Sequence, residues 1–273
     1  MRIIHDKWVI STRDIVAELE CSHRLHLEWA VITKSVEKPT NEISPELELL
    51  AEIGLTHESK IAESLRNSGT YLDIGEPSFK IEEIQKAYEK TLAAVESGVE
   101  AIHQATFLTE NFLGFVDFLI LVKDPNGKPV KDSQDRFVYD PVDAKSARVA
   151  KRAAVIQVAT YAAIMKAVGM ATPQKVHLWL GGDKKWSASA LDLIDLAEHF
   201  MGRVREKIEN FTDAPSPLWA PPRESCTRCR WKYNCETGRD SDQDLSLIQG
   251  IRSNTRLALI KSEIKTINQM AIA

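Results

Sequence analysis

The sequence predicts an α/β protein, because helical and strand patterns alternate along most of the chain. Residues 45–69 and 149–169 carry apolar side chains at helical spacing, and each segment ends at a glycine. Between them, residues 112–124 have the almost wholly apolar composition of a long strand. Helices, then strands, then a helix and further strands are typical of layered α/β folds.

The remaining elements follow from the same patterns. Ser11 and Asp14 resemble a capping box that opens a helix over residues 12–32. The charged segment 123–136, with its prolines and its Asn-Gly pair, predicts a solvated turn between two paired strands. We also expect helices over 81–98 and 191–211, and strands over 70–74, 101–110, 136–147, 175–181 and 185–192.

Composition sets the general class of the protein. The 273 residues are 44% apolar and 27% charged, as in ordinary globular proteins, and suffice for one large domain with or without a small appendage. No run of 18 apolar residues and no secretory signal pattern occurs, so we expect a cytoplasmic protein with no membrane partner. The net charge of −4 does not by itself indicate a nucleic-acid binder.

Two carboxylates and a lysine lie in the two central strands. Asp117 interrupts an apolar run, where an unpaired carboxylate is costly. Asp143 and Lys145 are two residues apart and share one face of a strand, whereas Ala144 points away. Pairing of the strands would gather the three charged groups, which suits a Mg²⁺ or Mn²⁺ ion and a phosphodiester. A buried ion pair between neighbouring strands is the structural alternative.

Basic residues dominate the following segment. From Ala144 to Gly182 the sequence contains no Asp or Glu. Arg148, Lys151 and Arg152 crowd the start of the helix over 149–169, where cations oppose the helix dipole. This arrangement favours binding of an anion such as the DNA backbone, although a solvated basic patch is the alternative.

The four cysteines indicate a metal centre. Cys226, Cys229 and Cys235 follow the spacing C-x₂-C-x₅-C, and three thiols so close together in a reducing compartment are typical of a metal site. A closed site needs a fourth thiol, and Cys21 is the remaining cysteine of the chain. The spacing alone favours zinc, with an iron–sulfur cluster as the other thiolate-bound option.

The C-terminal segment follows a polar linker. Ile248–Ile251 has the sequence I-Q-G-I, which looks like half of a helix-hairpin-helix element that binds a phosphate backbone. The second half, Ser262-Glu263-Ile264, lacks the glycine expected before the isoleucine. A two-helix packing appendage is the alternative.

The ordered motifs resemble those of the RecB-like PD-(D/E)XK iron–sulfur nucleases. AddB-type nuclease domains and the CRISPR-associated RecB-like exonucleases share this series of motifs. A bacterial group of RecB-family nucleases is especially similar, since its members carry a tail like residues 245–271, often ahead of a helicase. The matching residues are Cys21, the helical His57, Gly114–Asp117, Pro141–Lys145, Gln157–Tyr161, Cys226, Cys229 and Cys235.

The resemblance implies a fold and a role for each matching residue. It implies a restriction-endonuclease-like core with a central mixed sheet flanked by helices, in a nuclease domain over 1–238 closed by the four cysteines, and a helical appendage over 239–273. Lys145 would orient the attacking water and offset developing charge, and Glu58 has no firm role. Gln157 and Tyr161 match a substrate-side motif and are expected to contact DNA. The metal ligands would be His57, Asp117, Asp143 and the carbonyl of Ala144.

The implied function is hydrolysis of DNA. The expected protein is a Mg²⁺- or Mn²⁺-dependent deoxyribonuclease, more an exonuclease than an endonuclease, acting on single strands or DNA ends in repair, recombination or defence. The resemblance implies an iron–sulfur cluster, of the 4Fe–4S type, in place of zinc, and a helicase as a potential partner. A non-catalytic DNA-binding module of a repair complex is the alternative, and the complete set of His57, Asp117, Asp143 and Lys145 favours the enzyme.

Overall fold

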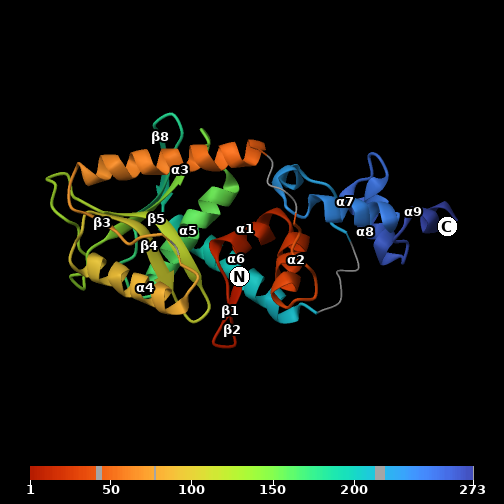
Figure 1. Ribbon diagram of the computed structural model, residues 1–273, viewed down its shortest axis with the longest axis horizontal. Helices are drawn as coiled ribbons and strands as arrows, with labels where there is room; N and C mark the ends of the chain where they lie inside the picture. The colour runs from red at the N-terminus through yellow and green to blue at the C-terminus, as the bar shows by residue number, and fades with distance from the viewer. Residues whose placement is uncertain (41–44, 77, 213–218, 273) are drawn as a thin grey trace. The chain divides into compact units, whose positions relative to one another are not determined.

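The described residues form two compact units. The structure is a computed structural model that describes residues 1–40, 45–76, 78–212 and 219–272. The sheet unit comprises Met1–Leu19 and Ser44–Lys207, and the cysteine unit comprises Glu20–Ile43 and Ile208–Ala273 (Figure 1). Across the part of the chain that is described, no helix has the length and apolar character needed to cross a membrane.

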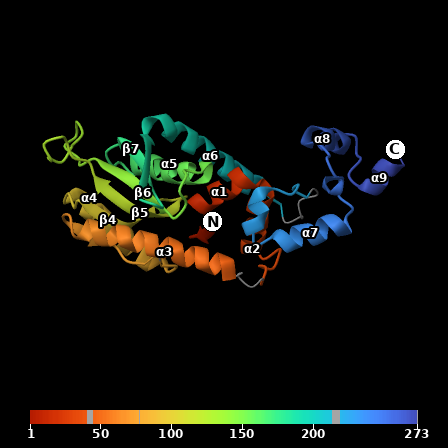
Figure 2. The same ribbon diagram turned by 90° about the horizontal axis from the view of Figure 1, so that it is seen from above.

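A six-stranded mixed sheet forms the centre of the sheet unit. Its strands run in the order β3-β4-β5-β6-β7-β8. Figure 2 shows the central strands β4, β5, β6 and β7. The pairs β3–β4 and β6–β7 are parallel, and the other neighbours are antiparallel. The predicted α/β class with a mixed sheet is therefore confirmed. The bounds are β3 Tyr71–Asp73, β4 Ala101–Leu108, β5 Leu113–Leu121, β6 Tyr139–Lys145, β7 Lys175–Leu180 and β8 Lys184–Ser189.

Helices cover both faces of the sheet. Helix α3 (Pro45–Arg66) begins at the predicted proline and packs Ala62 against Phe118. Helix α4 (Ile81–Glu96) packs Ile84 against Leu113. Because side chains alternate along a strand, Leu113 and Phe118 point to opposite faces of β5. Helices α3 and α4 therefore lie on opposite sides of this strand (Figure 1).

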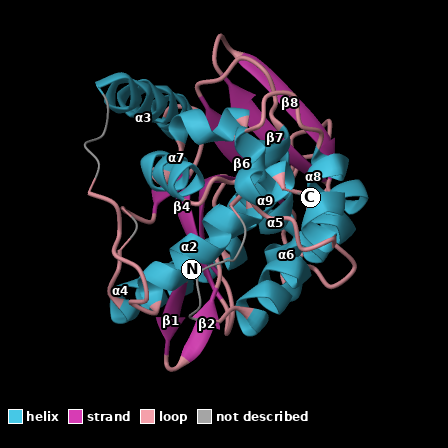
Figure 3. Cartoon of the chain, turned by 90° about the vertical axis from the view of Figure 1, so that its right-hand side faces the viewer, coloured by secondary structure: helices cyan, strands magenta, loops and turns pink. Residues whose placement is uncertain are grey.

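Two further helices complete the sheet unit. Helix α5 (Arg152–Ala167) contacts β6 and β7, is buried along most of its length, and is followed by the predicted stop, Gly169, at a φ of +82°. Helix α1 (Thr12–Glu20) is tied to α6 (Leu191–Asn210) by the buried Glu18, whose Oε1 contacts both Arg203 and Lys207 of α6. A hairpin of β1 (Arg2–Ile4) and β2 (Lys7–Val9) precedes them and was not predicted (Figure 3).

The central strands β5 and β6 separate inside the sheet. The two described strands are paired only over Phe118–Leu121 of β5. Strand β5 nevertheless stays paired with β4 along its length, and β6 stays paired with β7 as far as Lys145. Asp117 and Asp143 are thus the first residues beyond the last β5–β6 pair. We call this point of separation the strand fork.

A break at Cys21 opens the cysteine unit. The single helix predicted over residues 12–32 is wrong: α1 ends at Glu20, and α2 (Ser22–Ile32) begins two residues later, with Cys21 between them. Cys21 has an extended backbone, with φ −163° and ψ 102°, as residues that precede a helix commonly do. A break of one residue leaves the helical spacing on both sides intact, so the periodicity could not reveal it.

The C-terminal segments pack around Trp231 and Arg256. The buried Trp231 donates its Nε1–H to Glu28 of α2 at 2.9 Å. Arg256 is buried, lies 2.9 Å from Asp244, and donates to the carbonyl oxygen of Trp219 at 2.8 Å. The elements here are η1 Glu224–Arg228, α7 Lys232–Ser241, η2 Leu245–Leu247, α8 Ser253–Lys261 and α9 Ile267–Ala271.

Both turns of the C-terminal segment use the same backbone conformation. Gly250 has a φ of +79°, and Glu263 has a φ of +64°. The second turn therefore adopts the left-handed conformation that favours glycine although its sequence supplies glutamate, at a cost on the order of 1 kcal/mol. Thr266 and Gln269 then form a capping box at the start of α9.

Candidate functional site

The strand fork brings together the three charged side chains of the central strands. Asp143 is completely buried, and its Oδ2 lies 2.7 Å from Nζ of Lys145. Ala144 donates its N–H to Oδ2 of Asp117 at 2.7 Å. The Asp117 carboxylate thus bridges from β5 to β6 just where the regular pairing of the two strands has ended.

Negative charge at the fork is not balanced by the chain. Burial raises the pKa of Asp117 to about 7, and the neighbouring Asp143 carboxylate adds to this effect. Burial likewise raises the pKa of Asp143, against the opposing attraction of Lys145. Oδ1 of Asp143 has no hydrogen-bond partner among the described residues. Two crowded carboxylates, one ammonium and a bare buried oxygen fit a divalent cation, which takes oxygen ligands and neutralises their charge.

Glu58 supplies a third carboxylate near the fork. It interacts electrostatically with both fork aspartates and with Lys145. His103 on β4 holds Oε1 of Glu58 at 3.0 Å, and the Gln104 amide donates to the same oxygen. The hydrogen bond with His103 lowers the pKa of Glu58, so this carboxylate stays ionised.

The backbone of β4 is strained where it orients Glu58. Gln104 has a φ of +53°, a left-handed conformation that L side chains rarely adopt and that costs on the order of 1–2 kcal/mol. Strain of this kind persists where the surrounding contacts hold it, often at functional sites. The adjacent polar residues His103 and Gln104 inside an otherwise apolar strand were the sequence signal for this interaction.

His57 contacts the backbone of β7. Its Nε2 is 3.0 Å from the carbonyl oxygen of Trp179 on β7. Among the described residues, no group of three or more His, Cys, Asp or Glu side chains is arranged to hold a metal ion. Asp117 and Asp143 are the residues that would hold a cation at the fork, with Glu58 nearby. The part that His57 and the Ala144 carbonyl would play stays a prediction from the resemblance.

Tyr161 holds the open arm of the fork. Its hydroxyl is buried and donates to the carbonyl oxygen of Phe115 at 2.6 Å, in the part of β5 that has separated from β6. Burial raises the pKa of Tyr161, so the hydroxyl keeps its proton. Gln157 lies one turn earlier on α5 and is half-buried. The cations expected to meet DNA are exposed: Arg148, Lys151 and Arg152.

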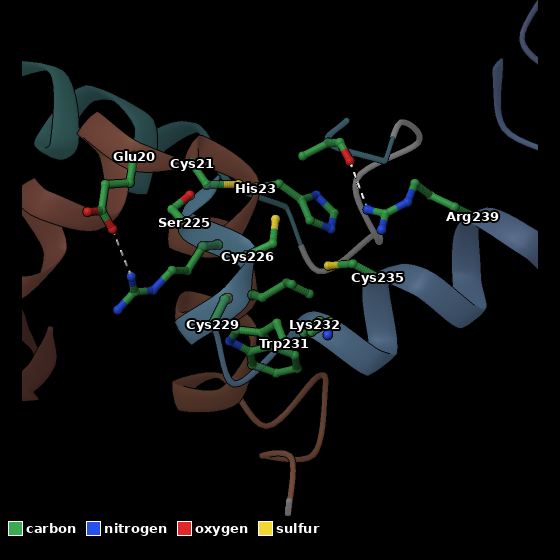
Figure 4. Close-up of a pocket in the computed structure, with 13 residues that line it drawn as sticks. Glu20, Cys21, His23, Ser225, Cys226, Cys229, Trp231, Lys232, Cys235 and Arg239 are labelled. Carbon is green, nitrogen blue, oxygen red and sulfur yellow. Dashed lines mark hydrogen bonds and ion pairs between the residues drawn. The ribbon is translucent and has the colours of Figure 1, made fainter. Parts of the chain in front are cut away.

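The four cysteines line one pocket in the cysteine unit (Figure 4). Cys21 comes from the break before α2, Cys226 and Cys229 from η1 and its end, and Cys235 from α7. Burial raises the pKa of Cys229 and raises that of Cys235 to about 11, and the neighbouring thiols add to both effects. A metal centre would offset this cost of ionising several buried thiols at once.

His23 points into the same pocket (Figure 4). Both of its ring nitrogens are buried without a hydrogen-bond partner among the described residues. Burial lowers the pKa of His23 to about 4, so the imidazole is neutral at pH 7. The free space between the side chains is about 20 Å³, close to that of one water, so a larger group requires the side chains to turn outward. The spacing Cys21-x-His23 was the available sequence signal.

Comparisons with known proteins assign no family. A scan against protein-family models found no match, and neither did a search of the curated proteins. The resemblance to RecB-like nucleases therefore stays a prediction from the motifs.

The raised pKa of Asp117 predicts the pH dependence of stability in metal-free protein. An unfolded aspartate ionises near pH 4, whereas Asp117 in the folded protein holds its proton to about pH 7. Between these values the folded state binds more protons, so its free energy of unfolding should fall with rising pH, by on the order of 4 kcal/mol, and then level off. Urea unfolding in EDTA measures this, and Asp117→Asn should show a smaller fall, because only the raised pKa of Asp143 then contributes. Equal pH slopes in both proteins would contradict the assigned burial.

Proposed function

We propose that this chain is a Mg²⁺- or Mn²⁺-dependent deoxyribonuclease with a PD-(D/E)XK core, acting on single strands or DNA ends. The observation that carries the proposal is the buried pair of Asp117 and Asp143 beside Lys145 at the strand fork. The order of the motifs, from Cys21 to Cys235, supports the same assignment.

A purely structural ion pair accounts for this site less well. An ion pair needs one acid and one base, whereas Asp117 and Asp143 share a single ammonium, that of Lys145. Glu58, which His103 holds, adds negative charge nearby. A buried carboxylate with an unpartnered oxygen is unfavourable, and proteins rarely keep one that serves stability alone. A site that takes up a cation explains why the chain tolerates this excess of negative charge.

The chain's own residues divide the work of phosphodiester hydrolysis. A bound Mg²⁺ or Mn²⁺ ion supplies Lewis-acid polarisation of the phosphate and lowers the pKa of water. Asp117 and Asp143 hold the ion, and the Ala144 N–H fixes the Asp117 carboxylate. Lys145 presents its ammonium beside Asp143, where it can orient the attacking water and donate to the phosphate oxygens as negative charge develops.

Nucleic acid would approach along the basic segment after β6. Arg148, Lys151 and Arg152 follow Lys145 within seven residues, and all three are exposed. Lys151 directly precedes α5 and is exposed, so its ammonium can reach a phosphate from solvent. Tyr161 is assigned here to holding β5, because its hydroxyl is already bonded to Phe115.

The cysteine pocket is proposed to hold an iron–sulfur cluster, as the motif order implies. Cys21, Cys226, Cys229 and Cys235 supply the four thiolates that such a cluster uses. A single zinc ion is the alternative for a Cys₄ site. In either case the centre joins residues from both ends of the chain, so its binding energy contributes to folding.

Cleavage of end-labelled DNA tests the nuclease proposal. With Mn²⁺ or Mg²⁺ the protein should cut single-stranded DNA, and EDTA should stop the reaction. Lys145→Ala should reduce the rate about 10²-fold or more because a charge-stabilising donor is lost. Asp143→Asn should abolish cleavage while the melting temperature holds or rises, because repulsion with Asp117 is relieved.

The matched control is Lys128→Ala, which removes an exposed cation from the turn between β5 and β6 and should cut at the wild-type rate. Full activity in Lys145→Ala would place the chemistry elsewhere. DNA binding without cleavage under every metal condition would leave the non-catalytic binding module as the function.

The metal centre is tested by colour and composition. Protein purified without air should absorb broadly near ~400 nm and contain iron and labile sulfide. Cys229→Ala should lose this absorbance, melt at a lower temperature and become sensitive to protease, because a structural ligand is removed. Thr227→Ala, two residues away, is the control and should keep the colour. A colourless wild-type protein with one zinc per chain would reject the cluster.

A further inference from the structure

An open pocket of about 430 Å³ lies next to the strand fork in the sheet unit. Ser146 directly follows Lys145, and His57 directly precedes Glu58, so the lining of the pocket continues from the carboxylate site. One wall is a stripe along α3, and the other consists of the loops that follow β6 and β7. The lining residues are Leu49, Glu52, Ile53, Thr56, His57, Lys60, Ser146, Arg148, Gly181 and Gly182.

Two glycines in the loop after β7 let this loop lie against the loop after β6, and they place no side chain in the pocket. A Cβ atom on Gly181 would lie 2.2 Å from the carbonyl oxygen of Ser146, which no side chain could tolerate. The Gly181 N–H donates to Ala147 at 3.0 Å and joins the two loops. Gly182 has a φ of +71°, which favours glycine on conformational grounds. A ligand in the pocket would therefore meet mainly backbone atoms and the Arg148 side chain on the loop wall.

The α3 wall of the pocket is cationic at one end and apolar at the other. Lys60 and Arg148 are exposed cations. Leu49 and Ile53 belong to the same helical stripe as Lys60, yet they remain 56% and 45% exposed. Ile53 and Lys60 are seven residues apart, which is about 10 Å along a helix. Glu52, the acidic side chain among the described lining residues, lies at the apolar end, away from Lys60.

We propose that this pocket binds one unpaired nucleotide of the DNA strand, next to the phosphate that is cut. This inference rests on the proposed function and adds a substrate subsite to it. The phosphate would meet Lys60 and Arg148, and the base would cover Leu49 and Ile53. The volume lies within the range of sites that enclose small organic groups. The separation of the two ends, about 10 Å, is close to the length of a nucleotide.

A pocket of this kind selects single strands. A base inside a duplex is stacked and paired, and it must be extruded at a cost of a few kcal/mol before it can enter a pocket. A base in a single strand meets no such cost. The site therefore gives a physical reason for a preference for single strands or frayed ends.

Equilibrium binding in EDTA tests the subsite, because binding is then measured without cleavage. The probes are a short fluorescent single strand, the same strand without bases, and the matching duplex. Ile53→Ser should weaken binding of the normal strand about fivefold, since less apolar surface is buried, and should not affect the abasic strand. Lys60→Ala should weaken both strands and lower the salt slope by about 0.7 log units for the lost phosphate contact.

Two control variants distinguish loss of the subsite from a general loss of positive charge or from misfolding. Lys128→Ala removes an exposed cation outside the pocket and should change neither strand's affinity. Ile53→Leu keeps the apolar surface and should bind as wild type, which guards against a misfolded serine variant. Adding a terminal phosphate to the strand distinguishes two sources of the bound phosphate. A gain in affinity that Lys60→Ala abolishes assigns the pocket to the strand end, and no gain assigns it to an internal nucleotide.

Two results would overturn the subsite: equal effects of Ile53→Ser on normal and abasic strands, or a duplex bound as tightly as the single strand. Failure of the subsite differs from failure of the nuclease proposal. Metal-dependent cleavage with no effect of Ile53→Ser on binding removes the subsite alone. The expected binding pattern in a protein that cuts nothing removes the nuclease and keeps the nucleotide pocket.

Discussion

The separation of β5 from β6 is the constraint on which the proposed site depends. A regular antiparallel pair would use the backbone N–H and C=O groups of both strands in the ladder. Here the pairing stops after Phe118, and two side-chain contacts take over: the Asp117 carboxylate accepts from Ala144, and the Tyr161 hydroxyl donates to Phe115. These two hydrogen bonds hold the separated strands in place, and one of them is made by Asp117, which also contributes charge to the fork.

The fork is also the place where burial and charge conflict most strongly. Asp143 is completely buried, and Glu58 is kept ionised nearby by His103 and by the strained Gln104. Such an arrangement is costly for a protein that gains only stability from it, because unpaired buried carboxylates are destabilising. In the proposed function, a cation would convert this cost into binding affinity, and the adjacent pocket along α3 would hold the nucleic acid whose phosphate the cation polarises.

The cysteine unit also gathers buried metal-binding groups, here thiols and an imidazole in place of carboxylates. The break at Cys21 directs one thiol from the N-terminal part of the chain toward three from the C-terminal part. His23 adds a neutral imidazole whose nitrogens have found no partner among the described residues. Buried thiols and an unpaired imidazole gain little from one another, which is why we propose that the unit binds a metal centre.

Sequence patterns predicted the features that depend on the local periodicity of helices and strands. The spacing of Asp143 and Lys145 placed both on one strand face, and Gly169 marked the end of α5. Features that arise from tertiary contacts were not predictable: the fork itself, the one-residue break at Cys21, and the left-handed backbone of Gln104 and Glu263. In each case neighbouring elements fix a conformation that the local residues do not prefer, so no local pattern carries the information.

Calorimetric titration of Mn²⁺ into metal-free protein tests the central claim most directly. If the fork is built for a divalent cation, wild-type protein should bind Mn²⁺ through Asp117 and Asp143, and Asp143→Asn should lose this binding while its fold, judged by circular dichroism, remains. Glu198→Gln replaces an exposed carboxylate on α6 and should bind as wild type. Equal Mn²⁺ affinity in wild-type protein and Asp143→Asn would contradict the account, because the buried carboxylates would then be a structural ion-pair network only.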